Sequence, residues 1–377
     1  MRGLVNVIDS EPKINLPDNW EGLSICLQMT GGIGDVLIAV GSSANTLKSK
    51  QCKITAAVRD FQIPLTKQLY GIDEVIEGQK LNNPSVRNKF DVVINFAGVF
   101  NNQRYLKKNN YYKLVSERLG QEVEVGKFKF QYTKQYPRVC LHPGASNPNR
   151  RWSEEKWEEL ATKLSSKLEV IWLGTKDEFG FNSHNILKLS DCSDKLEFQA
   201  KYLARSACFI GNDSGFAHIA GIYGVWGLVI FSATHPDDVI ANYASLSGVH
   251  AFENYDSPSR SLRVDDSISR EYLEKITVDD ILVAGDFGNI EVKEAVKISS
   301  DKQKIALVGT SVEANTLTNY LMRYFDITQL SNMPTRDFEA VLILTQDVCQ
   351  VQVNDRKVRV ATSNYENVRR ALRELLV

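Results

Sequence analysis

Strand-like and helix-like runs alternate along most of this 377-residue chain. Short apolar runs followed by longer amphipathic stretches are typical of βα units, in which parallel strands are covered by helices. The strand-like runs in the first three quarters of the chain are Leu23–Met29, Lys53–Val58, Asp91–Phe96, Arg138–Leu141, Val170–Leu173, Cys208–Ile210 and Leu228–Phe231. The pattern therefore predicts an α/β fold with parallel sheets.

Glycine turns occupy two of the junctions between a strand and a helix. Residues 142–151 have the sequence HPGASNPNRR, and residues 211–218 have the sequence GNDSGFAH. A helix that starts at such a turn presents backbone N–H groups without partners, and its dipole adds roughly half a positive charge. These features form an anion site, and Arg150 and Arg151 add charge to the first. Two such turns predict a ligand that contains a nucleoside diphosphate.

The bulk composition narrows the class of protein. Hydrophobic residues make up 43% of the chain and the formal net charge is −1, without a block of like charges. This balance argues against non-specific nucleic-acid binding. No apolar run approaches the ~20 residues that cross a bilayer, and the first residues do not resemble a signal peptide, so a cytoplasmic protein is expected.

The six cysteines are scattered and include no Cys-x-x-Cys pair. Cys26, Cys52, Cys140 and Cys208 lie in strand-like runs, where a thiol usually packs as a small hydrophobic group. Reduced structural cysteines and no metal cluster are therefore expected.

The length suggests two or three domains at about 100–200 residues each. The expected divisions are residues 1–136, 137–300 and 301–377. The segment 245–270 is rich in Ser, Asp and Asn and predicts an irregular connection. Residues 301–377 show strand-like and helix-like runs without a phosphate loop or catalytic cluster. A small α/β domain with a role in assembly, as in a homo-oligomer, or in acceptor recruitment is predicted there.

Four motifs together resemble the heptosyltransferase family, which includes the ADP-heptose:lipopolysaccharide enzymes. They are Gly34-Asp35-Val36-Leu37, His142-Pro143-Gly144-Ala145-Ser146 with Arg150-Arg151-Trp152, Trp172-Leu173-Gly174-Thr175-Lys176-Asp177-Glu178, and Asn212-Asp213-Ser214-Gly215-x-x-His218-x-Ala220. The resemblance covers about residues 23–287. It implies a GT-B architecture, in which two Rossmann-like doubly wound domains face a cleft. The acceptor would bind the N-terminal domain, and a nucleoside-diphosphate sugar, as in ADP-heptose, would bind the C-terminal one. It also implies inverting transfer without a cofactor or essential metal.

The resemblance also assigns roles to individual residues. Asp35 corresponds to the proposed catalytic base, although an aspartate after glycine often only caps a helix. The donor-binding positions are Ser146, Arg150, Arg151, Glu178, Asp213, Ser214, Gly215 and His218. The acceptor-binding positions are Gly32, Gly34, Arg104 and Lys107. Arg150 would hold the diphosphate and Glu178 the ribose, whereas His142 is expected to be structural.

Two other functions remain open on the sequence. A sugar-nucleotide 2-epimerase shares the architecture, and a non-catalytic sugar-nucleotide-binding or assembly protein is the third possibility. The chain also departs from the family, because Phe231-Ser232-Ala233 replaces a common Gly-Pro and His235 stands where an aspartate is frequent. The donor sugar and the acceptor, which could be a glycan or a protein, are left open.

Overall fold

The computed structural model describes residues 5–7, 17, 19–100, 110–132, 136–175, 178, 186–192, 195–232, 234–251 and 266–287, and four strands between residues 304 and 362. The chain forms two compact units. One comprises residues 1–190 and 194–290, and the other comprises residues 191–193 and 291–377. The first unit holds two parallel sheets and the second holds one.

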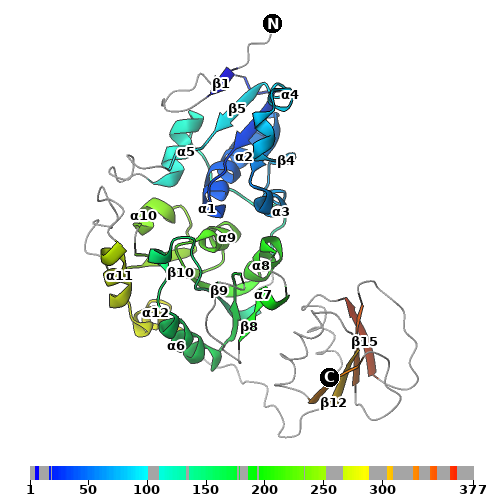
Figure 1. The fold of residues 1–377 in the computed structure, drawn as a ribbon, viewed down its shortest axis with the longest axis vertical. Coiled ribbons are helices and arrows are strands. Elements are labelled where there is room, and N and C mark those ends of the chain that lie inside the picture. Colours follow the sequence, from blue (N-terminus) through cyan, green and yellow to red (C-terminus); the bar gives the residue numbers. More distant parts are fainter. Residues whose placement is uncertain are drawn as a thin grey trace. The chain divides into compact units, whose positions relative to one another are not determined.

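The first sheet has the strand order β1-β5-β2-β3-β4, and every pair is parallel (Figure 1). Its strands are β1 (Val5–Val7), β2 (Ser24–Gln28), β3 (Lys53–Val58), β4 (Glu74–Glu77) and β5 (Val92–Asn95). The chain adds β3 and β4 on one side of β2 and then places β5 on the other side. The strand order therefore reverses between β2 and β5.

The second sheet has the order β11-β10-β9-β6-β7-β8 and is also parallel. Its strands are β6 (Tyr136–His142), β7 (Glu169–Trp172), β8 (Leu187–Lys188), β9 (Ser206–Asn212), β10 (Gly227–Ile230) and β11 (Leu246–Val249). Here the order reverses between β6 and β9. Open α/β sheets bind ligands beyond the carboxyl ends of the strands at such a reversal. The two glycine turns predicted as anion sites directly follow β6 and β9.

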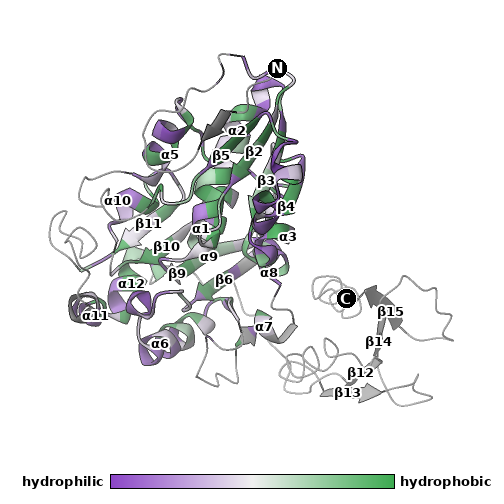
Figure 2. Ribbon diagram, turned by 45° about the horizontal axis from the view of Figure 1, so that its top comes forward, coloured by the Kyte–Doolittle hydropathy of each residue, from purple (hydrophilic) through white to green (hydrophobic). Residues whose placement is uncertain are grey.

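Helices connect the strands of both sheets. In the first half they are α1 (Ile33–Val36), a π-helical turn (Leu37–Gly41), α2 (Ser42–Leu47), α3 (Ile63–Thr66), α4 (Pro84–Arg87) and α5 (Tyr111–Leu119). In the second half they are α6 (Glu154–Ser165), α7 (Leu189–Cys192), α8 (Leu196–Leu203), α9 (Gly215–Tyr223), α10 (Pro236–Val239), α11 (Asp266–Lys275) and α12 (Val278–Ala284). Figure 2 shows apolar residues along the strands and many polar residues on α6. Among the residues that the structure describes, no helix has the length and apolar character needed to span a membrane.

A helix cap and a pair of tryptophans fix the start of α6. The Ser153 hydroxyl accepts a hydrogen bond from the Lys156 N–H at 3.4 Å and caps the helix. Trp152 and Trp157, which flank this cap, stack edge to face with ring centroids 5.3 Å apart and form a hydrophobic staple. Trp172 on β7 continues this cluster, at 6.1 Å from Trp157.

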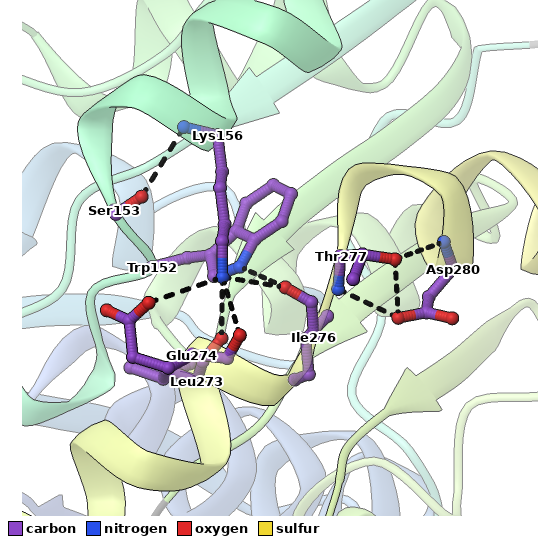
Figure 3. Close-up of polar contacts among 8 residues, drawn as sticks. All are labelled: Trp152, Ser153, Lys156, Leu273, Glu274, Ile276, Thr277 and Asp280. Atoms are coloured by element: carbon purple, nitrogen blue, oxygen red, sulfur yellow. Dashed lines mark hydrogen bonds and ion pairs between the residues drawn. The ribbon is translucent and has the colours of Figure 1, made fainter.

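Lys156 joins the start of α6 to the end of α11 (Figure 3). Its ammonium donates hydrogen bonds to the carbonyl groups of Leu273, Glu274 and Ile276 at 3.4, 2.8 and 3.0 Å. The Trp152 indole N–H donates to the same Ile276 carbonyl at 3.1 Å. The last carbonyls of a helix have no partner within it, and a cation there also opposes the helix dipole. Lys156 therefore holds α11 against the segment that follows β6.

The second unit contains a parallel sheet of order β13-β12-β14-β15. Its strands are β12 (Lys304–Val308), β13 (Asp326–Leu330), β14 (Ala340–Thr345) and β15 (Lys357–Thr362). The helix-like runs of this region lie outside the described residues.

The predicted α/β fold with parallel sheets is confirmed. The expectation of an irregular segment over residues 245–270 is wrong in part, because β11 and the start of α11 fall within it. β11 extends the sheet beside β10, and this pairing is a tertiary contact that composition alone does not reveal. The four cysteines in strand-like runs are buried and free, as expected. Burial raises the pKa of the Cys140 thiol to about 12, so it packs as a neutral group.

Candidate functional site

The N-termini of α1 and α9 lie against each other, although they follow strands of different sheets. A Cβ atom added to Gly34 would lie 2.5 Å from Cδ2 of His218, and one added to Gly215 would lie 2.7 Å from Cβ of Ile33. Real Cβ atoms essentially never approach another heavy atom this closely, so a larger residue at either position would force its neighbour to shift. Each helix therefore contributes one glycine that makes room for a side chain of the other. This contact brings the turn after β2 beside the turn after β9.

Asp35 lies at this contact, in the first turn of α1. Its Oδ2 accepts a hydrogen bond from the Gly32 N–H at 2.6 Å, so the capping role weighed from the sequence is real. Burial raises the pKa of Asp35 above its ordinary value, and the carboxylate of Asp213 raises it further. The Gly32 N–H and the guanidinium groups of Arg150 and Arg59 act in the opposite direction without cancelling the rise. A carboxylate with a raised pKa is a stronger base than a solvated one.

Arg150 and Asp213 form an ion pair between the turn after β6 and the turn after β9. Nη1 of Arg150 lies 3.2 Å from Oδ2 of Asp213, and the Asp213 side chain is only 5% exposed. The Thr234 hydroxyl donates a hydrogen bond to the same carboxylate oxygen. Asp213 is thereby fixed, and it orients a guanidinium whose own side chain is 31% exposed. The pair places a partly exposed positive charge at the switch point of the second sheet.

Hydrogen bonds from side chains to backbone groups hold the turn after β6 in shape. The Asn212 amide donates to the Pro143 carbonyl at 2.5 Å, and its oxygen accepts from the Trp152 N–H at 3.4 Å. The Ser232 hydroxyl donates to the Asn149 carbonyl at 2.6 Å. Nε of Arg151 donates to the Ala145 carbonyl at 2.8 Å. Arg151 thus braces the turn.

Glu178 lies on the other side of this turn, beside His142. Oε2 of Glu178 is 3.8 Å from Nε2 of His142 and accepts a hydrogen bond from the Thr175 N–H at 2.8 Å. Burial alone would raise the pKa of Glu178, but His142, Thr175 and Arg151 outweigh it and hold the pKa at about 2. The carboxylate is therefore ionised. Gly144 leaves space for it, since a Cβ there would lie 2.5 Å from the carboxyl group.

His142 also contacts Ser214, the residue that precedes α9. Nδ1 of His142 lies 2.9 Å from the Ser214 hydroxyl. Ser214 is the N-cap residue by backbone position, but its side chain makes no capping hydrogen bond. The first N–H groups of α9 are consequently not satisfied by this hydroxyl, which suits an anion site. His142 was expected to be structural, yet it links two predicted donor-binding residues.

The structure brings together most of the residues predicted from the motifs. Those that converge on the ends of β2, β6 and β9 are Asp35, Arg150, Glu178, Asp213, Ser214, Gly215 and His218. Ser146 is exposed on the turn after β6, and Gly32 is exposed before α1. Gly34 packs against His218. Arg104 and Lys107 lie outside the described residues.

The structure also adds residues to which the sequence assigned no role. Thr234 binds Asp213, and Tyr243 binds His218. In the described part of the chain, no cluster of three or more His, Cys, Asp or Glu side chains is arranged to hold a metal ion.

Comparison with known proteins agrees with this arrangement. Residues 99–263 match the model of glycosyltransferase family 9 (heptosyltransferase). A search of curated proteins finds no match. Three solved structures share the fold. The ADP-heptose lipopolysaccharide heptosyltransferase II of E. coli has a TM-score of 0.55 at 14% identity, over 70% of this chain and 98% of its own. The iron-containing dodecameric glycosyltransferase TibC of enterotoxigenic E. coli has a TM-score of 0.52 at 15% identity, over 71% and 77%. A family 9 glycosyl transferase of Veillonella parvula has a TM-score of 0.51 at 14% identity, over 71% and 97%.

The family match includes the turns after β6 and β9, and the match to heptosyltransferase II covers 70% of the chain. The expected GT-B architecture and the family resemblance are therefore confirmed. Residues 99–263 thus resemble a glycosyltransferase of the heptosyltransferase family, and the chain has the GT-B fold of the solved heptosyltransferases.

Proposed function

We propose that the protein is an inverting glycosyltransferase that moves a sugar from a nucleoside-diphosphate sugar to a hydroxyl acceptor, with Asp35 as the general base. One observation carries the proposal. Asp35 lies close enough to Arg150 and Asp213 for both to shift its pKa. A carboxylate of raised basicity thus lies within electrostatic range of a guanidinium suited to a phosphate.

The proposed chemistry follows from these two groups. The acceptor hydroxyl gives its proton to Asp35 as its oxygen attacks the anomeric carbon. The bond from that carbon to the diphosphate breaks on the opposite face, and the configuration inverts. Arg150 and the N–H groups at the start of α9 stabilise the charge that grows on the departing diphosphate. These groups supply the positive charge that a metal ion would otherwise bring.

ADP-heptose is the first donor to test, because heptosyltransferase II of E. coli is named for it. The ionised Glu178 would accept hydrogen bonds from the two ribose hydroxyls. The acceptor class is a glycan or a protein hydroxyl. A cytoplasmic location and assembly through residues 301–377 remain predictions of the sequence.

The same arrangement is compatible with a sugar-nucleotide 2-epimerase or a non-catalytic binding protein. The Gly34-Asp35 and Asp213-Ser214-Gly215 signatures favour transfer over epimerisation. A binding protein has no need of a half-buried carboxylate with a raised pKa.

The test is a panel of sugar nucleotides. The expected result is a rise in melting temperature with one or a few donors, followed by acceptor-dependent release of the nucleoside diphosphate. Isomerisation of the donor without an acceptor would identify an epimerase. Binding without any turnover over an acceptor panel would favour the non-catalytic function.

A further inference from the structure

A chain of three buried polar side chains connects α5 in the first half of the unit to α9 in the second. The Tyr112 hydroxyl donates to the Tyr243 hydroxyl at 2.7 Å, and the Tyr243 hydroxyl lies 3.1 Å from Nδ1 of His218. Tyr112, Tyr243 and His218 are 2%, 3% and 4% exposed. Water therefore has little access to these hydrogen bonds.

Contacts at both ends hold these three hydrogen-bonded side chains in place. Asn110 caps α5 and also donates to the Asp237 carbonyl and the Asn242 side chain, at 3.2 and 2.6 Å. The ring of Tyr243 packs on the backbone of α9 at Gly221, where a Cβ would lie 2.4 Å from the ring. Tyr112 and Tyr243, which are 131 residues apart in the sequence, are thus held together beside His218.

Counting protons assigns the direction of each hydrogen bond. In the part of the chain that the structure describes, Tyr243 is the one hydrogen-bond partner of the Tyr112 hydroxyl. A buried O–H without an acceptor costs about 1–3 kcal/mol, so Tyr112 donates. The proton of Tyr243 is then directed to Nδ1 of His218. Burial lowers the pKa of His218 to about 4, with Arg150 acting in the same direction and Asp213 against it, so the ring is neutral at pH 7.

A neutral imidazole that accepts at Nδ1 carries its proton on Nε2. This nitrogen faces Gly34, since a Cβ added there would lie 2.8 Å from Nε2. Asp35 is the next residue. The Nε2–H donor is thereby presented at the start of α1, beside the proposed catalytic base and the Arg150–Asp213 pair.

We propose that Tyr243 and Tyr112 are positioning residues that hold His218 as its Nε2–H tautomer, so that it donates a hydrogen bond to an oxygen of the departing diphosphate. Because Tyr112 belongs to the first half of the unit, donor chemistry in the second half depends on the correct docking of α5. This inference rests on the proposed function for its substrate, but the tautomer itself is a property of the free protein.

The first experiment is nitrogen-15 NMR on protein labelled at its five histidines. His218→Gln assigns the resonance of His218. Wild-type protein should show the neutral Nε2–H form at pH 7. Tyr243→Phe should convert His218 to a mixture of tautomers, and Tyr112→Phe should give a smaller change in the same direction. Tyr223→Phe removes a hydroxyl from the same helix α9 that takes no part in the Tyr112–Tyr243–His218 hydrogen bonds, so it should leave the tautomer unchanged. An Nδ1–H tautomer in the wild type, or no response to Tyr243→Phe, would overturn the assignment.

The second experiment is a double-mutant cycle on turnover with the donor found in the panel. Tyr243→Phe should lower kcat about 3- to 10-fold, the value of one neutral hydrogen bond, while leaving the affinity for the nucleoside diphosphate within twofold. A glutamine at position 218 always carries N–H donors and needs no tautomer control. Tyr243→Phe should therefore have no further effect on kcat in the His218→Gln background.

The two experiments separate the possible failures. Equal losses from Tyr243→Phe in both backgrounds would mean that the tyrosine acts only through packing, and the positioning role would be rejected. If no donor in the panel supports turnover while the NMR result holds, the proposed function fails and the tautomer assignment stands. If turnover is found and the tautomer does not respond, only this inference fails.

Discussion

Replacement of Asp35 by asparagine separates its two roles, capping and catalysis. Asparagine nearly preserves the size of the side chain, and its amide oxygen can still accept the Gly32 N–H that now lies 2.6 Å from Oδ2. Exchanging a charge-assisted hydrogen bond for a neutral one costs about 1 kcal/mol. Burial of the carboxylate, which raises the pKa of Asp35, opposes folding of the ionised form, and this cost disappears in the variant. The net change in stability should be within about 1 kcal/mol, or about 2–4 °C in Tm.

Donor affinity should be unchanged or slightly higher in Asp35→Asn. The substitution removes a negative charge near the guanidinium of Arg150, so a bound diphosphate meets less repulsion. Turnover should nevertheless fall ~10²–10⁴-fold, which is the typical contribution of a general base and corresponds to about 2.7–5.5 kcal/mol in activation free energy. In the wild type, kcat/KM should decrease as the pH falls through the raised pKa of Asp35, because protonation removes the base.

The assays are initial rates of nucleoside-diphosphate release, calorimetric titration with the same nucleotide, and thermal unfolding. Asp213→Asn is the matched control, since it removes an equivalent charge from the same cluster but loosens Arg150. It should weaken nucleotide binding, whereas Asp35→Asn should not. Near-normal turnover in Asp35→Asn would refute the base assignment, and a large loss of stability without a specific catalytic defect would leave only the capping role.

Four further predictions test the surrounding structure. Arg150→Ala should weaken nucleoside-diphosphate binding by about ten- to a hundredfold in calorimetry, the value of a charge-assisted contact of roughly 1.5–3 kcal/mol; unchanged affinity would remove its proposed role. Lys156→Met should lower the unfolding free energy by about 2 kcal/mol, because three helix-end carbonyls lose their donor, whereas Lys163→Met on the exposed face of α6 should leave Tm nearly unchanged. Gly34→Ala should cost about 1–3 kcal/mol and much of the activity, because its Cβ would meet an imidazole at 2.5 Å, whereas Gly32→Ala meets its nearest atom at an ordinary 3.5 Å and should fold normally. A chelator should leave initial rates largely intact, and a reversible loss restored by one divalent ion would reject the metal-independent mechanism.

The sequence predicted most strands of the two larger sheets because each of these strands is a short apolar run. Lys53–Val58 was predicted with the bounds that the structure shows for β3. The helix that follows β2 begins at Ile33. There the Asp35 carboxylate reaches back to the Gly32 N–H, so the aspartate lies inside the first turn and does not precede it.

The missed elements have a different cause. β11 and α11 lie in a polar segment whose structure depends on pairing with β10 and on contacts with Lys156. Tyr243 lies just before β11 and belongs to none of the family motifs. Its role depends on contacts with α5 and α9, which are distant in the sequence. Propensity and periodicity describe local preferences, so tertiary contacts of this kind are outside their reach.

Two histidines of the candidate site show the same limit of sequence analysis. His142 and His218 both sit in apolar surroundings, where a lone histidine usually packs as a core residue. The family signature identified His218, but His142 was expected to be structural. Its partners Glu178 and Ser214 are 36 and 72 residues away. The ends of β6 and β9 lie together only in the folded structure, which shows that the His142 imidazole contacts both Glu178 and Ser214.

The glycine contacts between α1 and α9 explain why chemistry and packing share the same residues in this site. Gly34 precedes Asp35, and Gly215 follows Asp213 and Ser214, so each motif carries its glycine beside its charged side chain. A methyl group at either glycine would push the two helices apart, and the ends of the two sheets would separate with them. A displacement of about 1 Å at a reacting group can cost 10²-fold in rate. The distance between the proposed base and the guanidinium proposed to bind the phosphate therefore depends on two glycines without side chains, which a search for catalytic residue types alone would overlook.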